Sequence, residues 1–271
     1  MLFNVNHPDE TVSLPGRLKE ISGICLYAPH KLACVQDEKG IIFIYDLKKN
    51  KLLAGIKFSK DRDYEGIANV ADSIFVLCSN GELFKVWNLD ADTIHSETIP
   101  TILTKQNNCE GLCYDKTNDR LLIACKGRPI RNTAPASAHA VYAFDLKQRE
   151  VQTQPVFLIY PDSVKQLLES EGQSTRIIKE SGEEIPFDFA PSELNIDPVT
   201  GDIYMISSFG KTLIVLDNAG NLKCAIRLDV KLYRQPEGLT FKSNGDLMIS
   251  NEGKEGRATL TVLKRPGKKK N

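Results

Sequence analysis

Short apolar runs separated by polar turn residues recur along the whole chain. The runs are strand-length and rich in β-branched and aromatic residues, as in 41–47, 140–146 and 212–217. Several end at an Asp that suits a tight reversal, including Asp46 and Asp145. The pattern therefore predicts an all-β protein.

One short motif recurs within this pattern. Its copies are Ile21-Ser22-Gly23-Ile24, Tyr64-Glu65-Gly66-Ile67, Cys109-Glu110-Gly111-Leu112, Pro191-Ser192-Glu193-Leu194 and Pro236-Glu237-Gly238-Leu239. Measured at the Ser or Glu position, three intervals span 43 to 45 residues and one spans 82. Four strands follow within each short interval, which is the spacing of propeller blades, whereas a β-sandwich would show turns without a fixed period. The sequence therefore predicts a five-bladed β-propeller.

Two segments depart from the period. The long interval predicts an insertion in blade three over about 152–189, with a short helix at 163–170, and it lacks the second motif that a sixth blade would need. A further excursion at 128–135 interrupts the same blade, so both are expected to cap one face of the propeller. The N-terminal stretch 2–14 is expected to supply the missing outer strand of the last blade. Residues 1–271 would then form one domain.

Composition narrows the choice of partners and compartments. The chain has 35 basic and 35 acidic residues, which removes the electrostatic case for binding nucleic acid. No apolar run reaches the ~20 residues that cross a bilayer, so no transmembrane segment is expected. The first residues lack the basic and apolar regions of a secretory signal, which indicates either a cytoplasmic protein or a mature form. Seven cysteines, with no metal-type CxxC pair, are expected to be reduced and structural.

The polar position of the motif is the candidate site. Because the first strand of each blade lines the central channel, Ser22, Glu65, Glu110, Ser192 and Glu237 are expected around the axis. Converging glutamates need either raised pKa values or a cation among them, and Ca²⁺ prefers oxygen ligands. The absence of His from the motifs argues against zinc or iron. The candidate metal ligands are Glu20, Asp63, Glu65, Glu110, Glu237 and Asn251.

A structural alternative stays open. The glutamates could bond backbone N–H groups of neighbouring blades and bind no metal, and Lys126 at the end of a second strand could neutralise part of the ring. The residues expected to line the funnel are Ser22, Asp37, Asn80, Lys126, Ser192 and Glu193.

The five motif copies, taken in order, resemble the SdiA-regulated (YjiK-like) β-propeller family, which is distantly similar to NHL-repeat proteins. The resemblance implies five blades, a calcium site, and an exported or membrane-anchored bacterial protein located in the periplasm or at the cell surface. This chain departs from the family pattern at Glu193, where Gly is usual, and in the blade-three insertion. The missing export signal leaves a cytoplasmic location as the alternative.

Two functions fit these residues. The first is a monomeric, non-catalytic, extracytoplasmic propeller in which calcium shapes the funnel and an unknown small molecule or protein docks on the capped face. The second is a calcium-dependent hydrolase of the lactonase, esterase or phosphatase type, in which the cation polarises a carbonyl or phosphoryl oxygen. Glu65, Glu110 and Glu237 would then be ligands, and Glu20 or Asp63 would activate water.

Overall fold

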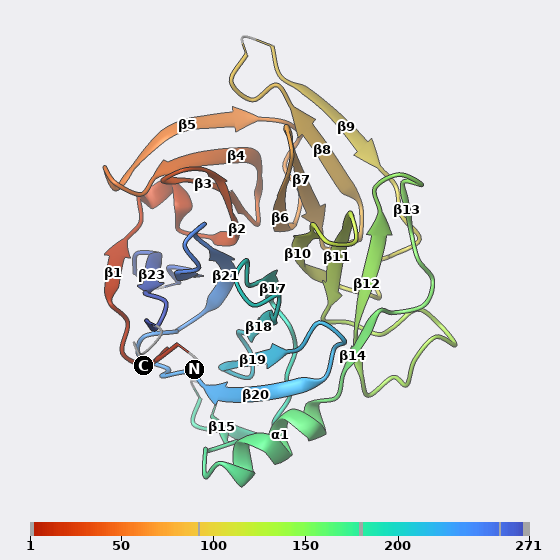
Figure 1. The fold of residues 1–271 in the computed structure, drawn as a ribbon, viewed down its shortest axis with the longest axis vertical. Coiled ribbons are helices and arrows are strands. Elements are labelled where there is room, and N and C mark those ends of the chain that lie inside the picture. The colour runs from red at the N-terminus through yellow and green to blue at the C-terminus, as the bar shows by residue number, and fades with distance from the viewer. Residues whose placement is uncertain (1–2, 92, 179–180, 255, 268–271) are drawn as a thin grey trace.

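The computed structural model describes residues 3–91, 93–178, 181–254 and 256–267. They form five antiparallel sheets arranged radially around a central axis (Figure 1), which confirms the predicted all-β five-bladed propeller. Blade one contains β2 (Ile21–Ala28), β3 (Lys31–Gln36), β4 (Lys39–Asp46) and β5 (Lys51–Lys57). Blade two contains β6 (Tyr64–Val70), β7 (Ser73–Cys78), β8 (Leu83–Trp87) and β9 (His95–Ile99).

The remaining three blades follow the same order from the axis outward. Blade three contains β10 (Cys109–Asp115), β11 (Arg120–Cys125), β12 (His139–Asp145) and an outer edge split into β13 (Glu150–Val151) and β14 (Phe157–Ile159). Blade four contains β17 (Glu193–Ile196), β18 (Ile203–Ser207), β19 (Thr212–Leu216) and β20 (Leu222–Arg227). Blade five contains β21 (Pro236–Phe241), β22 (Leu247–Asn251), β23 (Thr259–Leu263) and β1 (Glu10–Ser13).

Burial falls from the middle of each blade to its outer edge. Every residue of β7 is buried, whereas most residues of the outer strand β5 are exposed. The apolar side chains fill the spaces between neighbouring blades, as where Phe58, Tyr64 and Phe84 meet in edge-on contacts. All seven cysteines lie in the described part of the chain, where they are buried and form no disulfide.

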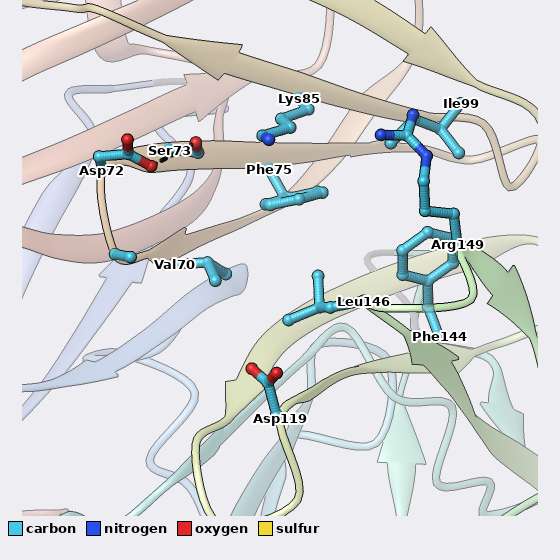
Figure 2. A pocket seen from close by; sticks show the side chains of 11 residues that line it. Val70, Asp72, Ser73, Phe75, Lys85, Ile99, Asp119, Phe144, Leu146 and Arg149 are labelled. Atoms are coloured by element: carbon cyan, nitrogen blue, oxygen red, sulfur yellow. Dashed lines mark hydrogen bonds between the residues drawn. The ribbon is translucent and has the colours of Figure 1, made fainter.

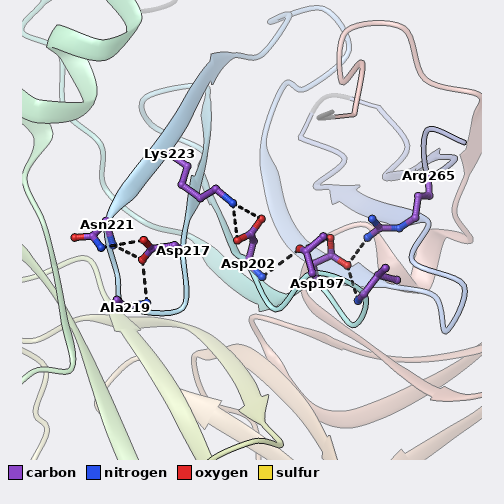
Figure 3. Close-up of polar contacts among 9 residues, drawn as sticks. Asp197, Asp202, Asp217, Ala219, Asn221, Lys223 and Arg265 are labelled. Atoms are coloured by element: carbon purple, nitrogen blue, oxygen red, sulfur yellow. Dashed lines mark hydrogen bonds and ion pairs between the residues drawn. The ribbon is translucent and has the colours of Figure 1, made fainter. Parts of the chain in front are cut away.

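Asp residues that close the third strands hold the turns that follow them. The Asp217 carboxylate accepts backbone N–H bonds from Ala219 and Asn221 (Figure 3), and Asp46 and Asp145 accept equivalent bonds from the turns of blades one and three. A carboxylate that satisfies turn N–H groups in this way replaces water and fixes the reversal. The predicted role of these Asp residues is therefore confirmed.

The ring closes through chain segments that are distant in sequence. Strand β1 pairs antiparallel with β23, with Glu10 opposite Val262, so it forms the outer edge of blade five. An ion pair between buried Asp197 of blade four and Arg265, just after β23, joins the last two blades (Figure 3). Residue 2 of the predicted closing segment 2–14 lies outside the described residues.

The insertion lies over blade four rather than across the channel. After β14, helix α1 (Pro161–Ser170) packs against β20, because its apolar residues Val164 and Leu168 join the core of blade four. The Gln173 side chain then donates to the Ala225 carbonyl and accepts from the Arg227 N–H group. The expectation of a helical cap over one face is therefore corrected, because α1 covers an outer edge. Among the described residues of the insertion, those in and beside the hairpin of β15 (Ile177–Ile178) and β16 (Glu184–Ile185) reach the channel mouth.

The 128–135 excursion and the connection from β1 to β2 both lie outside the strands of the blades. The 128–135 excursion folds back onto blade three, where the Ile130 N–H group donates to the Tyr142 hydroxyl. A 3-10 turn (Gly16–Leu18) connects β1 to β2. Across the described ranges, the one α-helix is too short and too polar to cross a membrane.

Candidate axial binding site

The motif glycines let the innermost strands approach one another closely around the axis. A Cβ atom at Gly23 would lie 2.8 Å from the Glu65 carbonyl oxygen, and one at Gly66 would lie 2.8 Å from the Leu112 nitrogen. Such distances are shorter than real Cβ contacts, so only glycine fits there. The motif therefore has a structural function, which is to let the innermost strands β2, β6, β10, β17 and β21 pack closely around the axis.

The two motif serines connect neighbouring blades. Ser22 Oγ donates to the Tyr64 carbonyl at 2.7 Å, and Ser192 Oγ donates to the Pro236 carbonyl at 3.0 Å. Both hydroxyls are buried, and each bond crosses from one innermost strand to the next. The two motif serines thus join neighbouring blades through their hydroxyls.

Glu193 stands where the other blades have glycine, and it also bridges two blades. Its Oε1 atom accepts bonds from the N–H groups of Leu112, at 2.8 Å, and Leu194, at 2.9 Å. Its Oε2 atom is buried without a hydrogen-bond partner among the described residues. Burial raises the pKa of this carboxyl well above its ordinary value.

The motif glutamates lie close enough for Glu110 and Glu237 to raise the pKa of Glu65, and for Glu237 to raise the pKa of Glu110. Burial, with Glu110 and Asp63 as neighbours, raises the pKa of Glu65 to about 10. Burial also raises the pKa of Glu237, which receives hydrogen bonds from Ser208 and Gln235. Glu65 therefore favours the protonated form at neutral pH unless a positive charge joins it.

Lys126 provides a positive charge next to the motif glutamates. Its Nζ atom is 3.2 Å from Glu110 Oε1, and Asn108 Nδ2 donates to the same oxygen at 2.8 Å. Burial outweighs this ammonium group and leaves the pKa of Glu110 raised, at about 7. One lysine therefore compensates only part of the negative charge.

A second set of carboxyl groups extends the cluster through blades one, two and five. Burial together with Glu20 and Glu38 raises the pKa of Asp37 to about 6, and burial together with a hydrogen bond to Glu20 raises the pKa of Glu252 to about 8. Asp63 is exposed and bonds to Ser79. We call the following residues the axial acidic cluster: Glu20, Asp37, Asp63, Glu65, Glu110, Glu237 and Glu252.

The two amide candidates are occupied within their own blades. Asn80 Nδ2 donates to Glu82 Oε2 at 2.8 Å in the turn after β7, so the structure does not add this amide to the cluster. Asn251 Nδ2 donates to Thr259 Oγ1, and its buried Oδ1 atom is unpaired among the described residues. Sequence reasoning placed Asn80 in the funnel from its position at a strand end, but the following turn uses its side chain.

The cluster fits a hard cation by chemistry, although it is not drawn together around one point. Its donors are carboxylate oxygens, and buried oxygens of Asp37, Glu193 and Gln235 lack hydrogen-bond partners among the described residues. Within those residues, no three His, Cys, Asp or Glu side chains are arranged closely enough to hold a metal ion. Glu65, Glu110 and Glu237 are the residues that would hold Ca²⁺, which would supply positive charge and a Lewis acid.

The cluster opens into a cleft with a volume of about 810 Å³. Glu237 of the axial acidic cluster lines the cleft, together with Lys126 and Gln235, which contact the cluster residues Glu110 and Glu252. Ile178 and Ile185 of the insertion hairpin form one wall. The sequence motif could not reveal this cleft, because most of its lining comes from loops without a repeated pattern. These loops include 208–211 after β18 and 228–235 after β20.

A second cleft lies away from the axis, between the outer parts of blades two and three (Figure 2). Its volume is about 230 Å³, and Phe75 and Phe144 contribute to its walls. The polar groups at its edge are already paired, since Arg149 bonds to Glu97 and Ser73 to Asp72. The axial cleft is therefore the better candidate site.

Fold and site together define this protein as a five-bladed β-propeller with an acidic axial channel that opens into one cleft. A model of the SdiA-regulated family matches residues 9–254. The chain therefore belongs to the SdiA-regulated family, which confirms the resemblance carried by the motif series. No protein with a curated description matches the sequence.

Solved structures with a similar fold have widely different sequences. Glutaminyl cyclase from Myxococcus xanthus has a TM-score of 0.61 at 13% identity, over 95% of this chain and 95% of that chain. A luciferin-regenerating enzyme has a TM-score of 0.56 at 13% identity, over 95% and 96%. A streptogramin B lyase has a TM-score of 0.52 at 12% identity, over 94% and 97%. At these identities the similarity shows the propeller fold alone.

Proposed function

We propose that this protein is a small-molecule-binding propeller in which the axial acidic cluster holds a calcium ion at the floor of the cleft. The observation that carries the proposal is the position of Glu237, which belongs to the cluster and also lines the cleft. A ligand in the cleft would therefore contact the group that holds the ion. Pockets with a few convergent polar groups and shifted pKa values are the usual places for ligand binding.

Charge balance supports the cation. Glu65 keeps its carboxyl neutral up to a pKa of about 10 because burial and its acidic neighbours act together, and the ammonium of Lys126 contacts Glu110 rather than Glu65. A divalent cation would supply the missing positive charge and favour the ionised carboxylates. Glu193 Oε2 is buried and has no hydrogen-bond partner among the described residues, so it is a further oxygen that a cation in the channel would satisfy.

A calcium-dependent hydrolase is the second candidate, and the pKa of Glu110 favours it. A carboxyl with a pKa of about 7 exchanges its proton at neutral pH, which is what a general acid or base requires. In this reading Glu65 and Glu237 would hold the ion, and Glu110, left out of the ligand set, would take the proton from an attacking water while Lys126 favours its carboxylate form. Turnover in a screen of lactones, esters and phosphate esters, lost in Glu110→Gln, would support it.

The periplasm or cell surface is the compartment we propose for the protein, because the chain belongs to the SdiA-regulated family and that resemblance implies an exported or membrane-anchored protein. Fractionation of cells that express the full-length gene product tests this. Recovery in the cytoplasmic fraction alone would contradict it.

Thermal unfolding with and without calcium tests the binding proposal. A ligand that binds only the folded state raises the melting temperature, so Ca²⁺ added to chelator-treated protein should stabilise it. The same addition should leave Glu237→Gln almost unchanged, whereas Glu150→Gln, an exposed carboxyl on blade three, should respond as the wild type does. Equal responses of all three proteins would contradict a site in the channel.

A further inference from the structure

The axial cleft is basic and apolar above its acidic floor. Glu237 is the only carboxyl-bearing residue among the described residues that line it. The basic residues of the lining are Lys126, Arg176, Lys211, Arg227, Arg234 and Lys254. Lys126 and Arg176 are paired with Glu110 and Glu184, so a negatively charged ligand in the cleft would meet chiefly the two remaining arginines, Arg227 and Arg234.

Arg227 is fixed at the junction of blade four and the insertion. Its guanidinium donates to the Gly210 carbonyl, on the loop after β18, and to the Arg176 carbonyl at 2.8 Å. Burial lowers the pKa of Arg227, and no carboxylate among the described residues pairs with it. The guanidinium is thus held in place by neutral carbonyls, and within the described part of the chain no carboxylate compensates its charge.

Arg234 contributes a second arginine that no described residue engages. It is exposed on the loop that leads into β21. The preceding residue, Tyr233, is fully buried and donates its hydroxyl to the Val5 carbonyl at 2.6 Å, which anchors the loop. A planar guanidinium on an anchored loop matches the two oxygens of a carboxylate or phosphate.

Exposed apolar side chains lie in the same cleft. Ile178, Phe209 and Val230 are 57%, 43% and 55% exposed, and they come from the insertion hairpin, the loop after β18 and the loop after β20. They are three of the seven large exposed apolar residues of the described chain. Apolar groups that gather in a concave site mark a surface that binds something.

We propose that the cleft binds a small amphipathic anion, with its carboxylate or phosphate group at Arg227 and Arg234 and its apolar body against Ile178, Phe209 and Val230. The inference rests on the proposed small-molecule-binding function and names its ligand class. The cleft volume of about 810 Å³ lies in the range of about 300–1,000 Å³ that holds small ligands. The charge, the apolar lining and the volume of the cleft therefore all fit a small amphipathic anion.

Calorimetric titration with matched probes tests the ligand class. Decanoate and decyl phosphate carry both a charge and an apolar chain, 1-decanol carries only the chain, and acetate and inorganic phosphate carry only the charge. We expect saturable binding of decanoate or decyl phosphate, with each single-feature probe weaker by about tenfold or more, because both parts of the cleft contribute. Whichever of the two amphiphiles binds better identifies the head group. Equal binding of 1-decanol and decanoate would overturn the claim of an anion site.

Variants separate the two halves of the cleft. Arg234→Gln should weaken decanoate by about tenfold through the loss of one charge-assisted bond, and Phe209→Ser should weaken it through the loss of apolar contact. Arg149→Gln removes an exposed arginine outside the cleft and should leave decanoate binding unchanged. Since Arg234 has no described partner, its replacement should not disturb folding, which the melting temperature checks. An equal loss in Arg149→Gln and Arg234→Gln would overturn the proposal.

The same titrations separate this inference from the proposed function. Binding of calcium without any of the probes would overturn the amphipathic-anion inference and leave the cation site intact. Binding of decanoate without calcium would support the inference and contradict the cation site. Dimerisation on size-exclusion chromatography that is abolished by Phe209→Ser, with no probe bound, would assign the cleft to a second copy of the chain and overturn the inference.

Discussion

At the scale of single residues, one motif position carries two kinds of chemistry. Ser22 and Ser192 use their hydroxyls to join neighbouring blades, whereas Glu65 and Glu110 place carboxyl groups in the channel. The sequence showed that these positions recur around the axis. It could not show which side chains would bond to backbone and which would remain available, since that depends on distances between blades.

Glu65→Gln is the sharpest test at this scale. At pH 7.5 Glu65 is ionised in the unfolded chain but must take up a proton to fold, because its pKa in the folded protein is about 10. This proton uptake lowers the stability of the folded state, and a neutral amide at the same position removes the need for it. In chelator-containing buffer we expect Glu65→Gln to melt several degrees above the wild type. The further rise that calcium gives the wild type should be lost.

Glu150→Gln serves as the control, because this carboxyl is exposed on the outer edge of blade three. It should match the wild type with and without calcium. A Glu65→Gln protein that is less stable than the wild type in chelator would show that Glu65 is already compensated within the channel.

At the scale of elements, the repeat predicted the blades well because the strands recur with the same spacing in each blade. The strands of blades one, two and four lie where the motif and turn residues placed them. The insertion was harder, because the contacts of α1 with β20 depend on a neighbouring blade rather than on the helix's own pattern. The place of Phe209 and Arg234 in the cleft could not be predicted either, because they lie on loops that are brought together only in the folded ring.

The innermost strands should not tolerate a side chain at the motif glycines. A Cβ atom at Gly66 would lie 2.6 Å from Leu112 Cβ, so Gly66→Ala must push β6 and β10 apart. We expect the free energy of unfolding to fall by about 1–3 kcal/mol, as measured by urea denaturation.

Gly16→Ala provides the matched control for this prediction. A Cβ atom at Gly16 would have no atom within 4 Å, so its effect should stay within about 0.5 kcal/mol. Equal effects of the two substitutions would show that close strand approach is not what the motif glycines provide.

At the scale of the whole molecule, charges of opposite sign are separated although the net charge is zero. Carboxyl groups gather in the channel, and basic side chains gather at its mouth. This separation explains why overall composition gave no sign of a charged ligand. It also makes stability depend on pH.

The raised carboxyl pKa values fix the sign of that dependence. The folded pKa values of Asp37, Glu110 and Glu252 are about 6, 7 and 8, all above their values in an unfolded chain. Between about pH 5 and pH 8 the folded state therefore holds more protons, so its stability falls as pH rises. Urea unfolding in chelator should show this decline, and saturating calcium should flatten it. A rise in stability over the same range would contradict the balance of charges described for the channel.

Calorimetric titration of chelator-treated protein with Ca²⁺ shows whether the axial channel holds the ion, with Glu110→Gln and Glu150→Gln titrated in parallel. The account predicts saturable binding near one equivalent in the wild type and in Glu150→Gln, and loss of binding in Glu110→Gln. An absence of binding in the wild type would contradict it, and would leave the axial acidic cluster as a protonated hydrogen-bond network with Lys126 as its counter-charge.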